Sequence, residues 1–430
     1  MSSEGGVTFA DALRGRYGDE EVRGSDEMVI VGGEMSTLAG VRTVVLSGLG
    51  MRWAGDVGHG ALAPRLRELD LSGNVLEDVG EVVAICRALP GLAFLNVSRN
   101  PLLGGARGLT PAGGGGPSSK LAHLIMDEVV AGGEGFSGEE GEGEGDVGVW
   151  SLVKALVGCL GCAETLVEVS VASNGVNGLW AGPGCPWPGL KRLRMDGNPM
   201  AGGWEGVAVA GALPDALETL EVRRCPGIKV VRWGDEGAQG HAAEHAAEHA
   251  AEHTAALDKL SGLRTLALSG TSVADWESVD AVARLPALRH VDLRGVVLGE
   301  ELPPALFRSL LIAHLPNLPS PAGHATVGSV SEQNMGHLNR SPVTRAERLE
   351  AHRNFLRHWE VRAEGDRPRR YDALLKELPA HARPSGADGL AAGGEGAPPV
   401  SAGDRMRAEL RGDARGIDAF DAQDLAHRLI

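Results

Sequence analysis

One apolar pattern recurs nine times along this chain of 430 residues and restricts its fold more than any other feature. Each copy fits L-x-x-L-x-L-x-x-N-x-L, with conservative replacements, as in LRELDLSGNVL from Leu66 and LKRLRMDGNPM from Leu190. The copies start at Val41, Leu66, Leu92, Leu121, Leu166, Leu190, Leu217, Leu263 and Leu288, with spacings of 25, 26, 29, 45, 24, 27, 46 and 25 residues. A fixed period in this range predicts a solenoid in which each copy is one structural repeat.

Within a copy, the apolar spacing is that of a short β-strand. In LRELDL, Leu69 and Leu71 face one side while Glu68 and Asp70 alternate to the other. One repeat cannot bury its own leucines, but stacked repeats bury them against one another at roughly 1.5–3 kcal/mol per side chain. Equivalent core positions are Leu95, Leu193 and Leu266. The sequence therefore predicts an α/β leucine-rich repeat solenoid, with a parallel β-sheet on the concave face and helices on the convex face.

Polar and aromatic positions also recur. Asn74, Asn100, Asn174 and Asn198 lie where the chain turns off each strand, and an amide there can bond backbone groups that the turn leaves unpaired. Residues 79–92 and 275–288 have helical apolar spacing and end near prolines. We expect the tryptophans to start equivalent helices and pack on the convex side: Trp150, Trp204 and Trp276.

Composition divides the chain. We expect an N-terminal capping segment at 1–40, the solenoid at 41–318, a helical C-terminal cap at 319–380 and a disordered tail with one candidate helix at 381–430. The two long spacings are predicted insertions, at about 131–148 and about 235–256. The first holds six acidic residues and no basic ones, so it cannot bury enough apolar surface to fold.

The second insertion contains HAAEHAAEHAAEH at 241–253, which repeats the zinc-peptidase spacing H-x-x-E-H. Histidines four residues apart on a helix could share a zinc ion. A peptidase also needs a third ligand and a closed pocket, and identical tandem copies are typical of low-complexity sequence. We expect a solvated helix and no catalytic residue, metal site or cofactor; adventitious metal binding and a zinc hydrolase are the alternatives. Cys159 and Cys162 are expected to be buried structural cysteines.

Charge and apolar content exclude several classes. The net charge of −16, from 41 basic and 57 acidic residues, disfavours a nucleic-acid binder. We find neither a signal peptide nor a run of about 18 apolar residues, so no membrane association is expected. Five cysteines are few and odd in number, which favours a reducing compartment and a cytoplasmic location.

Longer stretches resemble one family. Residues 66–102 are similar to the opening repeats of tubulin-specific chaperone cofactor E and its cofactor E-like relatives, and TFADALRGRYG at 8–18 is similar to the helix before them. Trp150 and Trp276 fall where the family has tryptophan, and RSLLIAHLP followed by RPRRYDALLKEL resembles its exit from the repeats. The resemblance covers about residues 8–380. The family's CAP-Gly loop and a full ubiquitin-like domain are not found in this sequence.

The resemblance implies a non-enzymatic tubulin-binding chaperone that acts in folding, assembly or dissociation of the tubulin heterodimer. Its partners would be α/β-tubulin and other tubulin cofactors, and it could associate with the cytoskeleton. The repeats alone imply only a protein-binding solenoid. The alternative is therefore a general intracellular leucine-rich repeat scaffold or regulatory subunit, of the phosphatase-regulatory or ciliary-assembly type.

In either case the outward strand positions are the candidate partner-binding residues. They are Glu68, Asp70, Phe94, Asn96, His123, Ile125, Arg192, Arg194, Arg223, His290 and Asp292. Phe94 and Ile125 are candidate apolar anchors. A basic group could attract an acidic partner, or could simply be solvated surface charge. Its members are Lys191, Arg192, Arg194, Arg223, Arg224 and Arg232.

Overall fold

The computed structural model describes part of the chain and divides it into two compact units. The described residues are 6–17, 40–57, 63–102, 120–129, 148–179, 186–208, 212–233, 255–320, 336–361, 367–368 and 370–377. The units are Met1–Arg348 and Leu349–Ile430. The acidic residues 134–146, the histidine tract at 241–253 and the tail at 381–430 lie outside the described residues.

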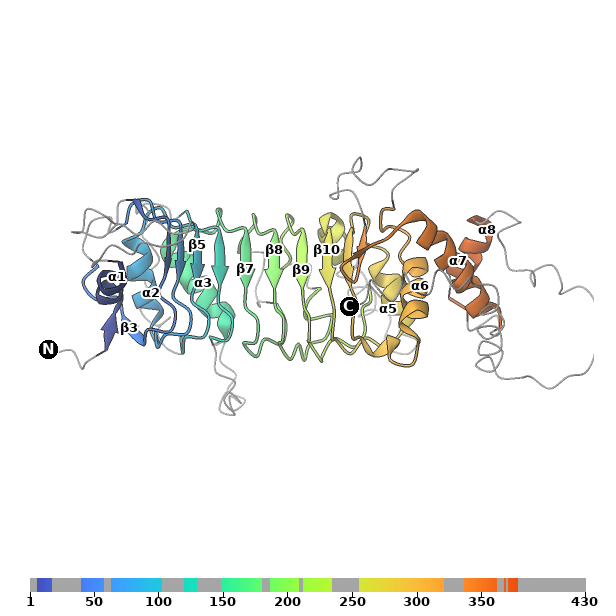
Figure 1. Ribbon diagram of the computed structural model, residues 1–430, viewed down its shortest axis with the longest axis horizontal. Coiled ribbons are helices and arrows are strands. Elements are labelled where there is room, and N and C mark those ends of the chain that lie inside the picture. Colours follow the sequence, from blue (N-terminus) through green and yellow to red (C-terminus); the bar gives the residue numbers. More distant parts are fainter. Residues whose placement is uncertain are drawn as a thin grey trace, which may run out of the picture. The chain divides into compact units, whose positions relative to one another are not determined.

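The first unit is built on an 11-stranded sheet whose strands follow one another in chain order (Figure 1). Ten strands form parallel neighbours: β2 (Thr43–Val45), β4 (Glu68–Asp70), β5 (Phe94–Asn96), β6 (His123–Ile125), β7 (Glu168–Ser170), β8 (Arg192–Arg194), β9 (Thr219–Glu221), β10 (Thr265–Ala267), β11 (His290–Asp292) and β12 (His337–Leu338). Every copy of the pattern supplies one of the first nine. The predicted α/β leucine-rich repeat fold is therefore confirmed.

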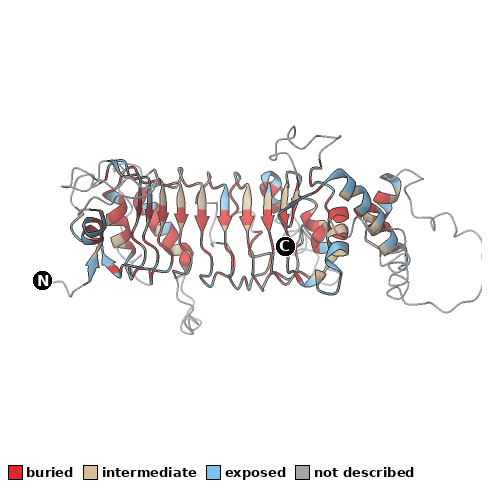
Figure 2. Ribbon diagram, viewed as in Figure 1, coloured by how far each residue is buried: buried red, intermediate tan, exposed pale blue. Residues whose placement is uncertain are grey.

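The register explains the core. Leu69 pairs with Leu95, Leu193 with Leu220, and Leu220 with Leu266, so equivalent apolar residues stack along the sheet. The side chains at these positions are fully buried. In Figure 2 the buried colour continues from strand to strand, with half-buried and exposed outward positions beside it. Stacking thus buries what a single repeat would leave exposed.

The asparagines connect neighbouring repeats. Asn198 Nδ2 donates to the carbonyls of Val171 and Met195 at 3.0 and 2.8 Å, and its Oδ1 accepts from the amides of Asn174 and Val176. Asn100 Nδ2 likewise donates to the carbonyls of Leu71 and Val97, one in the preceding repeat and one in its own. Asn74, Asn100, Asn174 and Asn198 are all buried. Each side-chain amide forms hydrogen bonds with backbone groups that would otherwise be buried without a partner where the β-strand ends and the turn begins.

Helices follow some of the strands. They are α2 (Val79–Arg87), α3 (Val149–Leu160), α5 (Trp276–Val282) and α6 (Pro304–His314), with short 3₁₀ turns η2 (Leu260–Gly262) and η3 (Val297–Gly299). Asp78 and Asp275 cap α2 and α5 by accepting from backbone amides of the first turn. Helix α2 packs on α3, and α5 packs on α6.

One expectation about these helices is wrong. Trp150 and Trp276 lie at the starts of α3 and α5, but Trp204 lies in a run of turns over 201–207. Glycines at 202, 203 and 206 disfavour a helix there. The Trp204 indole is nevertheless buried, edge-on to Trp233 at a centroid distance of 5.3 Å. Its role is packing, without a helix.

The ends of the first unit carry further elements. At the N-terminal end, β1 (Val7–Thr8) pairs with β3 (Met51–Trp53) beside α1 (Phe9–Tyr17). At the other end, β12 forms a hairpin with the antiparallel strand β13 (Ser341–Pro342). Arg308 holds this hairpin by donating to the carbonyls of Leu338 and Pro342.

The remaining helices are α7 (Arg345–Glu360) and α8 (Arg370–Glu377). In the second unit, Phe355, Leu356, Trp359 and Leu374 are buried, and the Arg367 guanidinium lies 4.8 Å from the centre of the Tyr371 ring. Among the helices that the structure describes, none has the length and apolar character needed to cross a bilayer.

Candidate partner-binding face

The outward strand residues form two continuous rows, which together we call the sheet face. The first row is Thr43, Glu68, Phe94, His123, Glu168, Arg192, Thr219, Thr265, His290 and His337. The second is Val45, Asp70, Asn96, Ile125, Ser170, Arg194, Glu221, Ala267 and Asp292. The structure thus places ten of the eleven candidate binding residues in these rows, and Arg223 follows two residues after β9 ends.

The two candidate apolar anchors are only partly accessible. Phe94 and Ile125 are half-buried, and the Phe94 ring lies 6.3 Å from the His123 ring. His123 Nδ1 is 2.9 Å from Glu168 Oε2, so a hydrogen bond to Glu168 fixes the His123 ring beside Phe94. A partner would therefore contact a flat apolar surface here, without a protruding side chain as an anchor.

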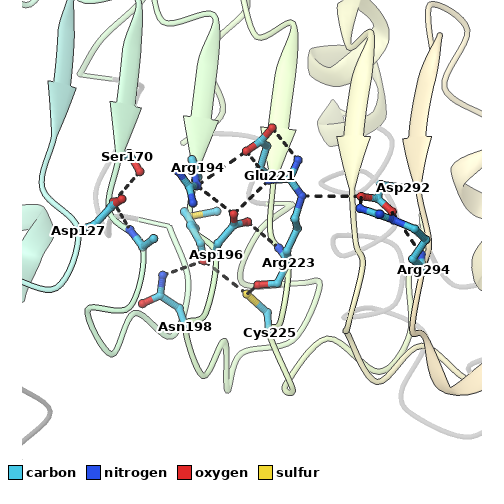
Figure 3. Close-up of polar contacts among 12 residues, drawn as sticks. Asp127, Ser170, Arg194, Asp196, Asn198, Glu221, Arg223, Cys225, Asp292 and Arg294 are labelled. Carbon is cyan, nitrogen blue, oxygen red and sulfur yellow. Dashed lines mark hydrogen bonds and ion pairs between the residues drawn. The ribbon is translucent and has the colours of Figure 1, made fainter. Parts of the chain in front are cut away.

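The centre of the sheet face is a network of ion pairs across β8 and β9 (Figure 3). Asp196 is 1% exposed and accepts from Arg194 Nε at 2.9 Å and from an Arg223 guanidinium nitrogen at 3.2 Å. Arg223 also forms a two-bond pair with Glu221 at 2.8 and 2.9 Å. Burial alone would lower the pKa of Arg223, but the hydrogen bonds and charges of Glu221 and Asp196 raise it above its usual value.

A second cluster surrounds Asp292 in β11, two strands beyond β9. Arg294 bonds both carboxylate oxygens of Asp292, at 2.9 and 2.8 Å. The guanidinium groups of Arg340 and Arg223 lie 3.8 and 4.0 Å from the same carboxylate. Burial alone would raise the pKa of Asp292, but the hydrogen bonds and charge of Arg294 and the charge of Arg223 lower it below its usual value, so the carboxylate is ionised at neutral pH.

Asp127, which follows β6, forms hydrogen bonds with residues of β7 and of the turn after it. Its Oδ1 accepts from Ser170 Oγ at 2.5 Å and from the Ala172 amide at 2.8 Å (Figure 3). Asp127 and Asp196 both lie two residues after a strand ends, where the side chain still points to the strand's outer face. The sequence reasoning missed four charged residues of the face: Asp127, Asp196, Arg294 and Arg340.

The predicted basic group is largely paired. Lys191 and Arg192 reach carboxylates of Glu218 and Glu168 at 3.2 and 3.3 Å, and Arg194 and Arg223 belong to the network above. Arg232 pairs instead with Glu277 in the first turn of α5, outside the sheet face. The structure therefore shows a lattice of opposite charges where the sequence suggested a cationic patch.

A depression of about 410 Å³ interrupts the face above β10. Its lining is Arg223, Thr265, Leu266, Ala267, His290, Val291, Asp292, His337 and Arg340. The imidazoles of His290 and His337 are stacked, 4.8 Å apart and 14° from parallel. Burial, followed by the charges of His337 and Arg289, lowers the pKa of His290 below 6.5, so this imidazole is neutral at physiological pH.

Within the part of the chain that the structure describes, no cluster of three or more His, Cys, Asp or Glu side chains could hold a metal ion. Cys159 and Cys162 are buried, as predicted, and so are Cys86 and Cys225. Burial raises the pKa of Cys86 and of Cys162 to about 12, which makes these thiols poor nucleophiles. The histidine tract lies outside the described residues.

The parallel strands in matching register, with stacked leucines and bridging asparagines, define a leucine-rich repeat protein. No family model matches the chain. It is 26% identical to the human tubulin-specific chaperone cofactor E-like protein over 345 residues, covering 77% of this chain and 64% of that protein. It is 24% identical to the Arabidopsis thaliana tubulin-folding cofactor E over 335 residues, covering 72% and 55%.

The resemblance to cofactor E and cofactor E-like proteins is therefore confirmed over about three quarters of this chain. A shorter match, 30% identical over 125 residues, joins 25% of the chain to 24% of the Bos taurus tubulin-specific chaperone E. The chain spans less than two thirds of the length of each of these relatives.

Two solved structures show more distant likeness. Human trophoblast glycoprotein 5T4 is 21% identical with a TM-score of 0.37, covering 53% of this chain and 69% of that one. Internalin C2 of Listeria monocytogenes is 15% identical with a TM-score of 0.34, covering 73% and 91%. The assignment of the fold rests on the sheet and its register.

Proposed function

We propose that this chain is a non-enzymatic, tubulin-binding folding cofactor of the cytoplasm. It holds tubulin on the sheet face and acts in folding, assembly or dissociation of the heterodimer, together with other tubulin cofactors. The observation that carries this proposal is the similarity, over about three quarters of the chain, to proteins named tubulin-specific chaperone cofactor E-like and tubulin-folding cofactor E.

The charge lattice suggests how such a face selects its partner. Most cations on the sheet face already have a carboxylate partner within the chain. A bound protein must therefore replace these ion pairs by pairs with its own charged side chains, which favours a partner with matching charge positions over any acidic protein. Binding one tubulin conformation more tightly than another would shift its population without any covalent chemistry. A function of this kind needs no catalytic residue.

Retention of purified tubulin by the immobilised full-length chain tests the proposal. Arg192→Glu is the informative variant because this side chain is 57% exposed and pairs with Glu168 on the surface. Placing two carboxylates together should weaken retention several-fold and change its salt dependence. Arg194 is left unchanged, since a glutamate there would remove an ion pair of the buried Asp196 and place a second negative charge beside it.

The matched control is Arg232→Glu, an equally exposed arginine outside the sheet face. It should retain tubulin as the parent chain does. Equal retention by both variants would remove the sheet face from the proposal. Enrichment of a phosphatase catalytic subunit from cell extract, with no tubulin, would replace the proposal by the scaffold alternative. Deleting residues 241–253 should leave retention intact, and its loss would favour a metal-dependent role.

A further inference from the structure

The depression above β10 exists because that strand has the smallest outward side chains on this part of the sheet. Ala267 stands between Glu221 and Asp292 of the neighbouring strands, and Thr265 stands between Thr219 and His290. The result is a hollow of about 410 Å³ that is lined by β10 and β11, with His337 of β12 at one side. Neighbouring strands are only about 4.8 Å apart, whereas a helix with its side chains is about 10–12 Å across. The depression therefore suits an extended polypeptide segment better than a helix.

Arg340 stands at the rim of the depression in a conformation that arginine rarely adopts. It follows Asn339 in the two-residue turn between β12 and β13, and their φ angles are 53° and 67°. Turns of this type need positive φ at both central residues, and glycine is favoured at the second. An arginine there strains the backbone, and such strain is often retained at functional sites.

The charges around the depression favour an acidic ligand. Three guanidinium groups, from Arg223, Arg294 and Arg340, lie within 4.0 Å of the single carboxylate of Asp292. Arg294 already bonds both oxygens of that carboxylate, and the Arg340 side chain remains 67% exposed. Arg223 Nε is buried and has no hydrogen-bond acceptor. Arg223 is already bonded to Glu221 and Asp196, and Arg294 to Asp292. Arg340 is therefore the cation of this corner that is most open to an acidic ligand.

We propose that the depression receives an extended, acidic segment of the partner protein, with one side-chain carboxylate bound by Arg340 and the segment lying over Thr265. The inference rests on the proposed function for the identity of the partner. A carboxylate fits better than a phosphate-rich ligand because the ionised Asp292 lies in the wall and repels doubly charged groups more strongly. The stacked imidazoles of His290 and His337 continue the same wall beside Asp292, and the partner's aliphatic stem can pack against them.

Fluorescence anisotropy of a labelled peptide of alternating glutamate and threonine, titrated with the full-length chain, tests this inference. The parent chain should bind it and should not bind the counterpart with glutamine in place of glutamate. Arg340→Gly should weaken binding about tenfold, which is the loss of one charge-assisted hydrogen bond. Its melting temperature should stay the same or rise, because glycine relieves the positive φ.

Arg99→Gly is the matched control, since Arg99 is also an exposed arginine with positive φ, 55°, but lies after β5. It should bind the peptide like the parent chain. Thr265→Tyr fills the floor and should abolish binding. Unchanged binding by Arg340→Gly and Thr265→Tyr would overturn the inference. So would an oligonucleotide that binds more tightly than the peptide and is lost in the same variants.

These results separate the two proposals. If the parent chain retains tubulin and the depression variants behave like it toward both ligands, the subsite is wrong and the proposed function stands. If the peptide binds as expected while tubulin is never retained, the subsite is correct and the proposed function fails.

Discussion

Replacing Asn198 by alanine should destabilise the sheet at one identifiable place. The Asn198 side chain is completely buried and makes four hydrogen bonds to backbone groups. Three of the groups it bonds belong to the preceding repeat: the Val171 carbonyl and the amides of Asn174 and Val176. Alanine removes all four bonds from their backbone partners, of which the Met195 carbonyl keeps the Cys225 thiol as a donor at 3.4 Å.

The magnitude follows from this count. Each lost bond to a buried group costs about 1 kcal/mol or more, so four bonds correspond to roughly 4 kcal/mol. A domain is typically stable by only about 5–15 kcal/mol, so the change should be large. Two repeats further along, the position of Asn198 is occupied by Thr271, whose hydroxyl donates to the Leu268 carbonyl. A repeat can therefore form with a smaller hydrogen-bonding side chain at this position. We therefore expect Asn198→Thr to be milder than Asn198→Ala.

Urea denaturation followed by circular dichroism measures the free energy of unfolding, and hydrogen exchange locates the change. The amides of Asn174 and Val176 should lose protection, while those of β4 and β5 should keep theirs. Asn177→Ala is the control, since Asn177 is exposed and its side-chain oxygen accepts a long bond of 3.4 Å from the Ala201 amide. A loss below about 1 kcal/mol in Asn198→Ala, with unchanged exchange, would refute the bridging role.

Three further predictions concern titration, reactivity and the end of the sheet. Burial and the charges of His337 and Arg289 lower the pKa of folded His290 below 6.5, so protonation of this imidazole favours the unfolded chain. The free energy of unfolding should therefore fall as the pH drops below about 6.5. Melting curves recorded at several pH values should show a smaller fall for His290→Gln than for the parent chain. Cys86 and Cys162, with pKa values of about 12, should react with iodoacetamide at pH 8 only after denaturation, and labelling of the native protein at these positions would contradict their burial. Arg308→Met should release the β12–β13 hairpin at a cost of about 2–3 kcal/mol, and unchanged exchange of the Asn339 amide would argue against this.

The repeats were predictable because their information is periodic. A leucine at a fixed offset specifies which residue is buried, and the register between Leu69 and Leu95 then follows from equal spacing. The asparagine positions follow from the same period. Local exceptions were not predictable in this way, because the glycines around Trp204 replace a helix by turns while leaving the tryptophan buried. Strand β12 was missed because it has only two residues and follows a long break in the pattern.

The sheet face was predicted residue by residue but not as an electrostatic surface, and the reason is geometric. Sequence reasoning grouped cations by proximity along the chain and left out the acids that alternation puts on the same side. Glu221 and Arg223 are two residues apart and point the same way, as do Asp292 and Arg294, so each pair forms within its own repeat. Pairs such as Arg192 with Glu168 require the strand register as well. Since Arg340 comes from a hairpin that lies outside the periodic pattern, it is the one cation near Asp292 that neither rule could have placed, and it is also the one most open to a partner.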